Sequence, residues 1–164
     1  MTKKAILVVG SFALFGVAFA QSKGKKTNSK GLKKDSVSIY KRPILDVFLG
    51  GSELAGGDIT KQEFDRLAPQ GIRLKATNGA VIDGFSFTYA ERNLYEDSAA
   101  NPIIVTDLLT EYCLGDSLSP IISKTIASRT KPGDTAVYDD IHIRMADGKP
   151  ASGKAMKFVI IRPH

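Results

Sequence analysis

Catalysis usually requires a nucleophile beside a base, or two carboxyl groups held in different environments. The 164-residue sequence offers few such groups, because it has only two histidines, His142 and His164, and one cysteine, Cys113. A Cys113–His142 pair is conceivable, but neither a third orienting group nor a known nucleophile motif accompanies it. Tyr112 and Leu114 flank Cys113 and indicate a buried, inert thiol, the alternative being a reactive thiol or an intermolecular disulfide. A lone cysteine excludes an intramolecular disulfide, so the domain must rely on its hydrophobic core.

One acidic pair lies near a histidine. Asp140 and His142 are two residues apart, and on a strand this spacing puts both on one face, as two ligands of a metal ion would be, with Asp139 beside them. Zinc sites normally need three protein ligands, including a cysteine or a second histidine, and neither is near in the sequence. Because His142 also lies between Ile141 and Ile143, we expect an exposed strand histidine and no metal site.

Three further carboxylates, Glu91, Glu96 and Asp97, lie in a polar stretch. They could form a glycosidase pair, but charges in polar loops are usually only solvated. The glycines form neither G-x-G-x-x-G nor a phosphate-binding loop. We therefore expect no cofactor and no enzymatic activity.

Basic residues gather in one segment. Residues 21–42 contain eight Lys or Arg and one acidic residue, Asp35, whereas residues 43–164 contain thirteen basic and sixteen acidic residues, a net charge of −3. A nucleic-acid-binding fold should carry its positive charge on the folded surface, so this distribution argues against one. The segment is poor in apolar residues, which predicts a largely disordered tail. It is either a solvated leader or a weak docking element for anionic envelope polymers, lipid headgroups or an acidic partner, through Lys23, Lys25, Lys26, Lys30, Lys33 and Lys34.

Residues 1–20 have the features of a secretory signal peptide. Lys3 and Lys4 precede the apolar run Ala5–Phe19, and Ala18-Phe19-Ala20 is a small-x-small cleavage site, which predicts cleavage between Ala20 and Gln21. A retained membrane anchor is the alternative. Sixteen residues at about 1.5 Å each reach roughly 24 Å, short of a hydrocarbon core of about 30 Å. We therefore expect an exported, periplasmic chain with no membrane span after processing.

Apolar runs and turn residues outline the remaining elements. Strands are predicted at 37–39, 44–49, 72–76, 81–82 with 85–89, 103–105 with a less regular continuation to 114, 137–145 and 158–161. Asn78-Gly79 predicts a hairpin turn between 72–76 and the following strand, and Gly84 a bulge or a close backbone approach. Residues 91–101 are predicted to be a loop. At 137–145 the odd-numbered apolar residues, Val137, Ile141, Ile143 and Met145, are expected to face the core.

Two short helices are predicted. Thr60 followed by Glu63 is a capping-box pattern, and that helix should run to Ala68, with Ile59, Phe64 and Leu67 as its apolar stripe. Ser119 and Pro120 are good first residues for a second helix of about three turns. Its buried side should carry Ile121, Ile122, Thr125 and Ile126.

Strands outnumber helices, and no alternation of strand and helix repeats along the chain. We predict three segments: a signal peptide at 1–20, the basic tail at 21–42, and one mostly β domain at 43–164, an antiparallel β-sandwich carrying two short helices.

The order of these elements resembles a known family. The resemblance covers roughly Pro43–Arg162 and is strongest in the last third of the chain. It is to the C-terminal periplasmic domain of the GldM/PorM gliding-motility and type IX secretion proteins of Bacteroidetes. The residues that carry it are Gly71-Ile72-Arg73-Leu74, Phe85 and Phe87 in one strand, Lys131-Pro132-Gly133-Asp134-Thr135, Asp140-Ile141, Asp147-Gly148 and the final apolar strand.

The resemblance implies an immunoglobulin-like, non-enzymatic module that contacts outer-membrane-associated ring proteins. Members of that family also have a cytoplasmic start, a membrane span and earlier periplasmic domains, which this sequence lacks, so we expect the docking module alone. The function expected is a periplasmic interaction subunit that docks onto a protein complex at or beneath the outer membrane. The alternatives are a glycan- or peptidoglycan-binding domain, disfavoured by the absence of Trp, and an envelope hydrolase, disfavoured by the few catalytic groups.

Overall fold

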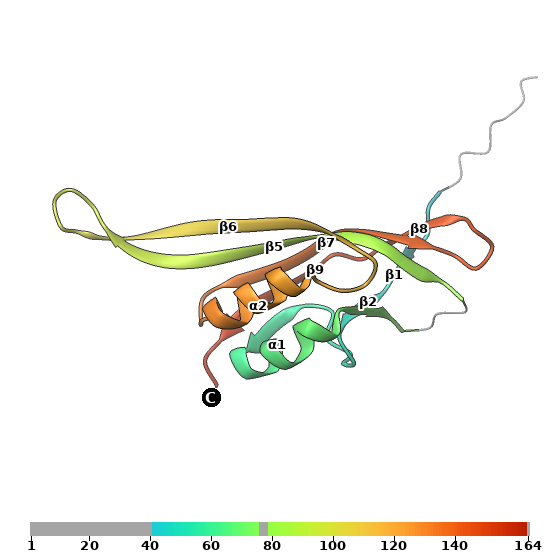
Figure 1. Ribbon diagram of the computed structural model, residues 1–164, viewed down its shortest axis with the longest axis horizontal. Helices are drawn as coiled ribbons and strands as arrows, with labels where there is room; N and C mark the ends of the chain where they lie inside the picture. The colour runs from blue at the N-terminus through green and yellow to red at the C-terminus, as the bar shows by residue number, and fades with distance from the viewer. Residues whose placement is uncertain (1–40, 76–78, 164) are drawn as a thin grey trace, which may run out of the picture. The chain divides into compact units, whose positions relative to one another are not determined.

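The computed structural model describes residues 41–75 and 79–163, and all of the elements in them belong to one unit. This part of the chain is mostly β, with two short α-helices, as predicted (Figure 1). The strands are β1 (Ile44–Leu45), β2 (Val47–Leu49), β3 (Gly57–Thr60), β4 (Ile72–Leu74), β5 (Val81–Glu96), β6 (Pro102–Leu114), β7 (Thr135–Arg144), β8 (Pro150–Gly153) and β9 (Met156–Ile161). The helices are α1 (Lys61–Leu67), the 3-10 turn η1 (Ala68–Gln70) and α2 (Pro120–Arg129).

Seven strands form one sheet around β7. One edge of β7 pairs with β5, and β6 pairs with the other edge of β5. The second edge of β7 is shared, because its first residues pair with β9 and its last three with β8. These pairs are antiparallel, but β1 pairs with β8 and β3 with β9 in parallel. The sheet is therefore mixed, which corrects the expectation of a wholly antiparallel arrangement. An immunoglobulin-like sandwich stays a prediction.

Two compensating irregularities lie where β7 changes its partner. Ser86 pairs with Asp139 and Gly84 with His142, so β7 contains one extra residue there, and Asp140 takes a positive φ of 45°. Between Gly84 and Ile82 the extra residue lies on β5 instead. The bulge predicted at Gly84 is confirmed.

The bulge in β7 reverses which of its residues face the core. Before it, Ala136 and Tyr138 are buried, and after it, Ile141 and Ile143 are buried. The expected burial of Ile141 and Ile143 is confirmed, but Val137 is only half-buried because the inserted residue shifts the alternation by one. A uniform period of two cannot anticipate an insertion within a strand.

Both helices begin at the predicted caps. Thr60 Oγ1 accepts a hydrogen bond from the Glu63 amide at 3.3 Å, and Ser119 Oγ accepts one from the Ile122 amide at 3.3 Å. Ile126 is buried in α2, but Ile121 is 77% exposed, which corrects its expected burial. Ile122 and Ile126 are four residues apart and share a face, whereas Ile121 is rotated away from that face.

The predicted hairpin between 72–76 and the next strand is wrong. Strand β4 pairs antiparallel with β2 in a separate two-stranded sheet, while β5 pairs with β6 and β7. Gly79 has the positive φ typical of a turn, 78°, but Asn78 lies outside the described residues, as does the strand predicted at 37–39. Alternation along a strand shows which face is buried and does not show which strand is its neighbour.

The expected loop at 91–101 is also wrong. Strand β5 continues to Glu96 and β6 starts at Pro102, so only residues 97–101 connect them. The extension has few buried positions, so the polar residues of β5 do not show the alternation of a half-buried strand.

The core lies between the seven-stranded sheet and the elements that cover it. The ring of Tyr138 contacts Phe85, Phe87 and Phe158, with centroid distances of 5.7, 4.9 and 6.1 Å. The helices and the small sheet contribute further buried side chains, among them Leu49, Phe64, Leu67, Ile72 and Ile126. Cys113 is a buried, free cysteine, as predicted.

Candidate functional site

The most distinctive feature is a two-stranded extension of the sheet. Strand β7 pairs with β5 only as far as Thr135, opposite Ala90. Strands β5 and β6 nevertheless stay paired beyond this point, from Glu91 opposite Asp107 to Glu96 opposite Pro102. We call residues 91–107 the arm; it projects past the helices in Figure 1, where it is drawn in yellow-green. In the part of the chain that the structure describes, no third strand pairs with the arm.

A buried carboxylate fixes the base of the arm. Asp134 is fully buried and precedes the first residue of β7. Its Oδ2 accepts hydrogen bonds from the Tyr89 hydroxyl at 2.5 Å and the Lys131 amide at 3.0 Å, and its Oδ1 accepts one from the Arg92 amide at 2.9 Å. The Asp134 carboxylate thus bonds to a β5 amide just beyond the last β5–β7 pair.

Charged side chains extend this anchor to the first residues of the arm. Lys131 Nζ lies 2.9 Å from Glu91 Oε1 and donates a hydrogen bond to Asn93 Oδ1 at 3.0 Å. Arg129, in the last turn of α2, lies 3.6 Å from the other oxygen of Glu91. Glu91 is therefore engaged in ion pairs that hold the base of the arm.

The tip of the arm is a capped turn. Asp97 Oδ1 accepts hydrogen bonds from the amides of Ala99 and Asn101, each at 2.8 Å. The bonds from the Asn101 amide and side chain, and then from the Ala99 amide, lower the pKa of Asp97. The role of Asp97 here is to close the turn between the two strands.

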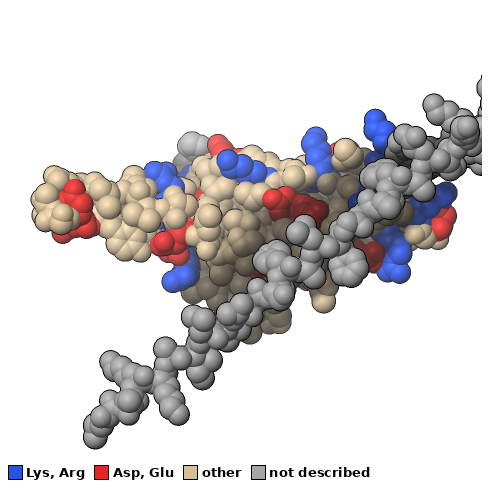
Figure 2. All heavy atoms as spheres, turned by 90° about the horizontal axis from the view of Figure 1, so that it is seen from above, with Lys and Arg blue, Asp and Glu red and all other residues tan. Residues whose placement is uncertain are grey.

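The outer face of β6, which points away from the core, is uncharged over the whole strand. Residues alternate between faces, and this face carries Pro102, Ile104, Thr106, Leu108, Thr110, Tyr112 and Leu114. Ile104 is 61% exposed and pairs with Leu94 of β5, which is 72% exposed, while Leu108 is 69% exposed. Figure 2 shows the arm as mostly uncharged surface with acidic groups near its tip. Large exposed apolar patches on soluble proteins usually mark interaction sites.

The opposite face of the arm is apolar at the tip and polar toward the base. Tyr95 pairs with Ile103 and Asn93 with Val105. Asp107 Oδ2 accepts hydrogen bonds from Asn93 Nδ2 at 2.7 Å and from the Tyr95 hydroxyl at 3.2 Å. These bonds hold the two strands of the arm together across its width.

The outer edge of β6 is unpaired among residues 41–75 and 79–163. Natural edge strands are usually protected by lysines, bulges or prolines. Strand β6 has no Lys or Arg, and its only proline is the first residue, Pro102. Its pairing with β5 continues without a register shift for thirteen residues. It is therefore a long, regular edge that is able to add another strand.

The residues singled out for catalysis are not brought together. His142 lies on the outer face of the sheet, where its Nε2 is 3.3 Å from Asp140 Oδ1, whereas Cys113 pairs with Phe85 on the core face. Burial, followed by the charge of Glu111, raises the pKa of the Cys113 thiol. The described residues contain no group of three His, Cys, Asp or Glu that could hold a metal ion. His142 is partly exposed, as predicted, and its ring is 6.5 Å from that of Tyr112.

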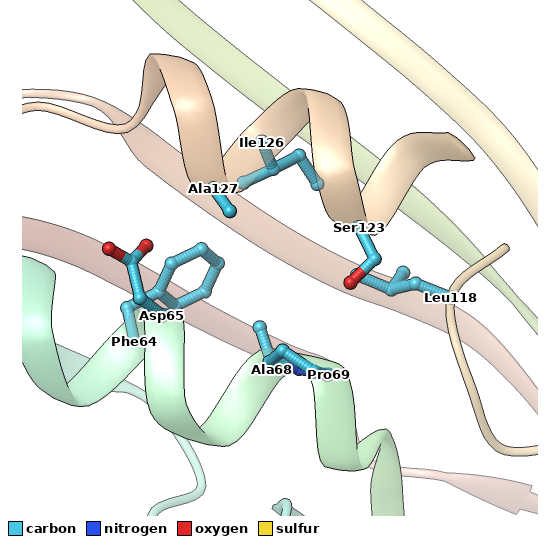
Figure 3. Close-up of a pocket in the computed structure, with 8 residues that line it drawn as sticks. All are labelled: Phe64, Asp65, Ala68, Pro69, Leu118, Ser123, Ile126 and Ala127. Atoms are coloured by element: carbon cyan, nitrogen blue, oxygen red, sulfur yellow. The ribbon is translucent and has the colours of Figure 1, made fainter. Parts of the chain in front are cut away.

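The hollow between α1 and α2 does not suit a small-molecule ligand. Phe64 and Asp65 of α1 face Ile126 and Ala127 of α2 across it (Figure 3). The cavity measures about 10 Å³, which is room for roughly one water molecule. One oxygen of Asp65 is buried without a hydrogen-bond partner and the other pairs with Lys61 at 2.6 Å. The contact is a helix–helix packing interface.

Several predicted features lie outside the described residues. These are the cleavage site at Ala20 and Gln21, His164, and the six tail lysines Lys23, Lys25, Lys26, Lys30, Lys33 and Lys34. Across residues 41–75 and 79–163, no helix has the length and apolar character needed to cross a bilayer.

No protein-family model matches this chain, and no curated protein matches its sequence. The resemblance to the GldM/PorM domain therefore remains a prediction. Sequence reasoning missed the arm because residues 103, 105 and 109 are also apolar, which hid the alternation on its outer face. The uncharged residues at the even positions from 102 to 114 were the pattern in the sequence that could have predicted a single long strand there.

Proposed function

We propose that this chain is a non-enzymatic interaction subunit that binds a partner protein through the β5–β6 arm. The observation that carries this proposal is the arm itself: two paired strands that leave the sheet and expose apolar residues, including Leu94 and Ile104. A two-stranded hairpin is only marginally stable alone in water. Here Asp134 and Lys131 hold its base in place, so the fold keeps an exposed element rigid at one end.

The partner we propose is a protein complex of the cell envelope, at or beneath the outer membrane. This rests on the predicted signal peptide and on the resemblance to the GldM/PorM docking domain. An immunoglobulin-like sandwich, a periplasmic location and a link to type IX secretion belong to the same proposal. The basic tail then supplies electrostatic attraction, while the arm supplies specificity.

The test is copurification from envelope membranes with paired variants. The tagged, exported protein should bring down a stoichiometric complex, and L94K/I104K should lose it because two charges replace the apolar Leu94–Ile104 pair, which lies between Arg92 and Glu96 on the outer face. I121K is the matched control, since Ile121 is as exposed as Leu94 but lies on α2. Equal recovery of the complex by L94K/I104K and I121K would remove the arm from the interface. Recovery of cell-wall fragments alone would favour the glycan-binding alternative.

The tail is tested separately by changing its six lysines to glutamine. Fifteen residues from Gln21 to Asp35, as a flexible coil, span roughly 20–23 Å, so they can reach a surface near the folded domain. Such contacts are screened beyond about 8 Å at physiological salt. The six-glutamine variant should bind the complex moderately less well, with a larger loss at low salt. Unchanged binding at low salt would make the tail a solvated leader.

A further inference from the structure

Within residues 41–75 and 79–163, no strand pairs with the outer edge of β6, which is thirteen residues long with Leu108 in the middle. We propose that two copies of this chain associate by antiparallel pairing of their β6 strands, about a two-fold axis that passes through Leu108. The two sheets would then continue into each other across this axis. This association is a property of β6 alone and does not depend on the docking function proposed above.

Side chains on the outer face of β6 favour one register of this pairing. In an antiparallel pair, residues directly opposite each other share a face. An axis at Leu108 places Leu108 opposite its own copy, Thr106 opposite Thr110, and Ile104 opposite Tyr112 of the second copy. Leucine against leucine, threonine against threonine, and an aromatic against a β-branched residue are all favourable cross-strand pairs. All thirteen residues are paired only in this register.

The charges of β6 are compatible with the same register. Its only charged residues, Asp107 and Glu111, lie on the inner face. The axis at Leu108 places Asp107 opposite Leu109 and Glu111 opposite Val105 of the second copy. No carboxylate faces another directly, but Asp107 lies diagonally across from Asp107 and Glu111 of the second copy, at about 7–8 Å, where like charges still repel, though less than in a directly opposed pair. The edge is therefore complementary to itself in side-chain type on its outer face, and its acidic residues avoid direct opposition only.

This pairing also gives the arm a third strand, next to β6. Because the strands run in opposite directions, the arm half of β6 in one copy lies beside residues 109–114 of the other. Leu94 and Ile104 then share a face with Tyr112 of the second copy, whose ring leans over its own Gly84 toward His142, and the symmetry repeats this arrangement. At the axis, Ala90 and Leu108 meet the same two residues of the second copy. A three-stranded arrangement with an apolar face is more stable than an isolated hairpin.

The size of the contact predicts a reversible dimer. Thirteen residues at about 3.4 Å each give a strip of about 44 Å, and a sheet thickness of about 10 Å gives roughly 900 Å² for the two copies together. Specific interfaces usually start at about 1,200 Å², so we expect a dissociation constant in the micromolar range.

The first test is sedimentation equilibrium of the exported chain, from Gln21, up to about 200 µM. The wild type should be a monomer–dimer mixture. L108K should raise the dissociation constant at least about tenfold, because two lysines meet on the axis. I121K, an equally drastic change at an exposed residue of α2, should alter it by less than about threefold. An equimolar mixture of L108K and L108E should restore association, because opposite charges then meet.

The register is tested by oxidative cross-linking. L108C should give a disulfide-linked dimer, since the two substituted residues face each other. I104C should not, because its copy lies eight residues away along the strand, about 27 Å. The wild type, which contains only the buried Cys113, is the control for background cross-linking.

A wild-type chain that stays monomeric at the highest concentration would overturn the proposal. Hydrogen exchange would then assign the edge: protection of the β6 amides that face away from β5 would point to coverage by the chain's own residues outside the described ranges, and unprotected amides to an edge kept for a different protein. Equal association of L108K and wild type, failure of the charge-reversed mixture, or cross-linking of I104C as efficient as that of L108C would each overturn the proposed axis.

Discussion

The hydroxyl of Tyr89 donates a 2.5 Å hydrogen bond to Asp134 Oδ2, and this bond joins β5 to the start of β7 at the base of the arm. A second tyrosine is buried as deeply, but the hydroxyl of Tyr138 has no hydrogen-bond partner. Replacing each tyrosine by phenylalanine should therefore change the free energy of unfolding in opposite directions.

Replacement of Tyr138 by phenylalanine should stabilise the protein. The change removes a buried, unsatisfied hydroxyl and keeps the ring that packs on Phe85, Phe87 and Phe158. We expect the free energy of unfolding in urea to rise by about 1–2 kcal/mol. Y89F should instead lower it by about 2 kcal/mol, because a hydrogen bond to a buried carboxylate is lost. Effects of the same sign would contradict this assignment of the two hydroxyls.

Replacement of Asp134 by alanine should be more damaging than either tyrosine change. It leaves the Tyr89 hydroxyl and the amides of Arg92 and Lys131 without their acceptor. At about 1–3 kcal/mol for each unsatisfied buried group, we expect a loss of at least about 3 kcal/mol in urea unfolding. D58A, at an exposed residue of β3, is the control and should stay within about 0.5 kcal/mol of wild type.

Stability should fall at alkaline pH. Burial, and for Tyr89 also the hydrogen bond to Asp134, raises the pKa of Tyr89 and Tyr138. Above about pH 10 the unfolded state loses these protons while the folded state keeps them, so the free energy of unfolding decreases as pH rises. Each tyrosine contributes up to about 1.4 kcal/mol per pH unit. Urea unfolding between about pH 9 and 11 should therefore show a shallower decline in Y138F than in wild type.

The core assignment of two residues can be checked by truncation. Phe87 and Ile143 are buried, as their alternation predicted. F87A and I143A should each reduce the free energy of unfolding by about 2–5 kcal/mol, through lost burial and a residual cavity. L94A, at an arm residue that is 72% exposed, is the control and should cost less than about 0.5 kcal/mol. A small effect of F87A or I143A would place that residue outside the core.

The mature N-terminus is predicted to be Gln21. Intact-mass measurement of the exported protein should give the mass of residues 21–164, reduced by the loss of ammonia if the terminal glutamine cyclises. A mass that includes Met1 would contradict the signal-peptide prediction. Processing can be measured on the exported chain without any knowledge of its partner.

Local features were predictable because they depend on residues close in the sequence. Thr60 and Glu63 predicted the start of α1, and Ser119 and Pro120 the start of α2, since capping involves neighbours within one turn. The mostly β character followed in the same way from short apolar runs between turn residues. The bulge at Gly84 was visible as well, because a glycine within a strand marks such irregularities.

Long-range relationships were decided by the tertiary structure. The pairing of β4 with β2, the parallel neighbours of β8 and β9, and the shared edge of β7 join segments far apart in sequence, and periodicity carries no information on them. The extra residue of β7 at Asp140 was not predictable from periodicity either, and it leaves Val137 off the core face. The arm emerged only from geometry: β5 and β6 have the composition of a polar loop and an irregular apolar run. Beyond Thr135, where β7 stops, the two strands pair only with each other among the described residues, and this geometry is what makes them the proposed interaction element.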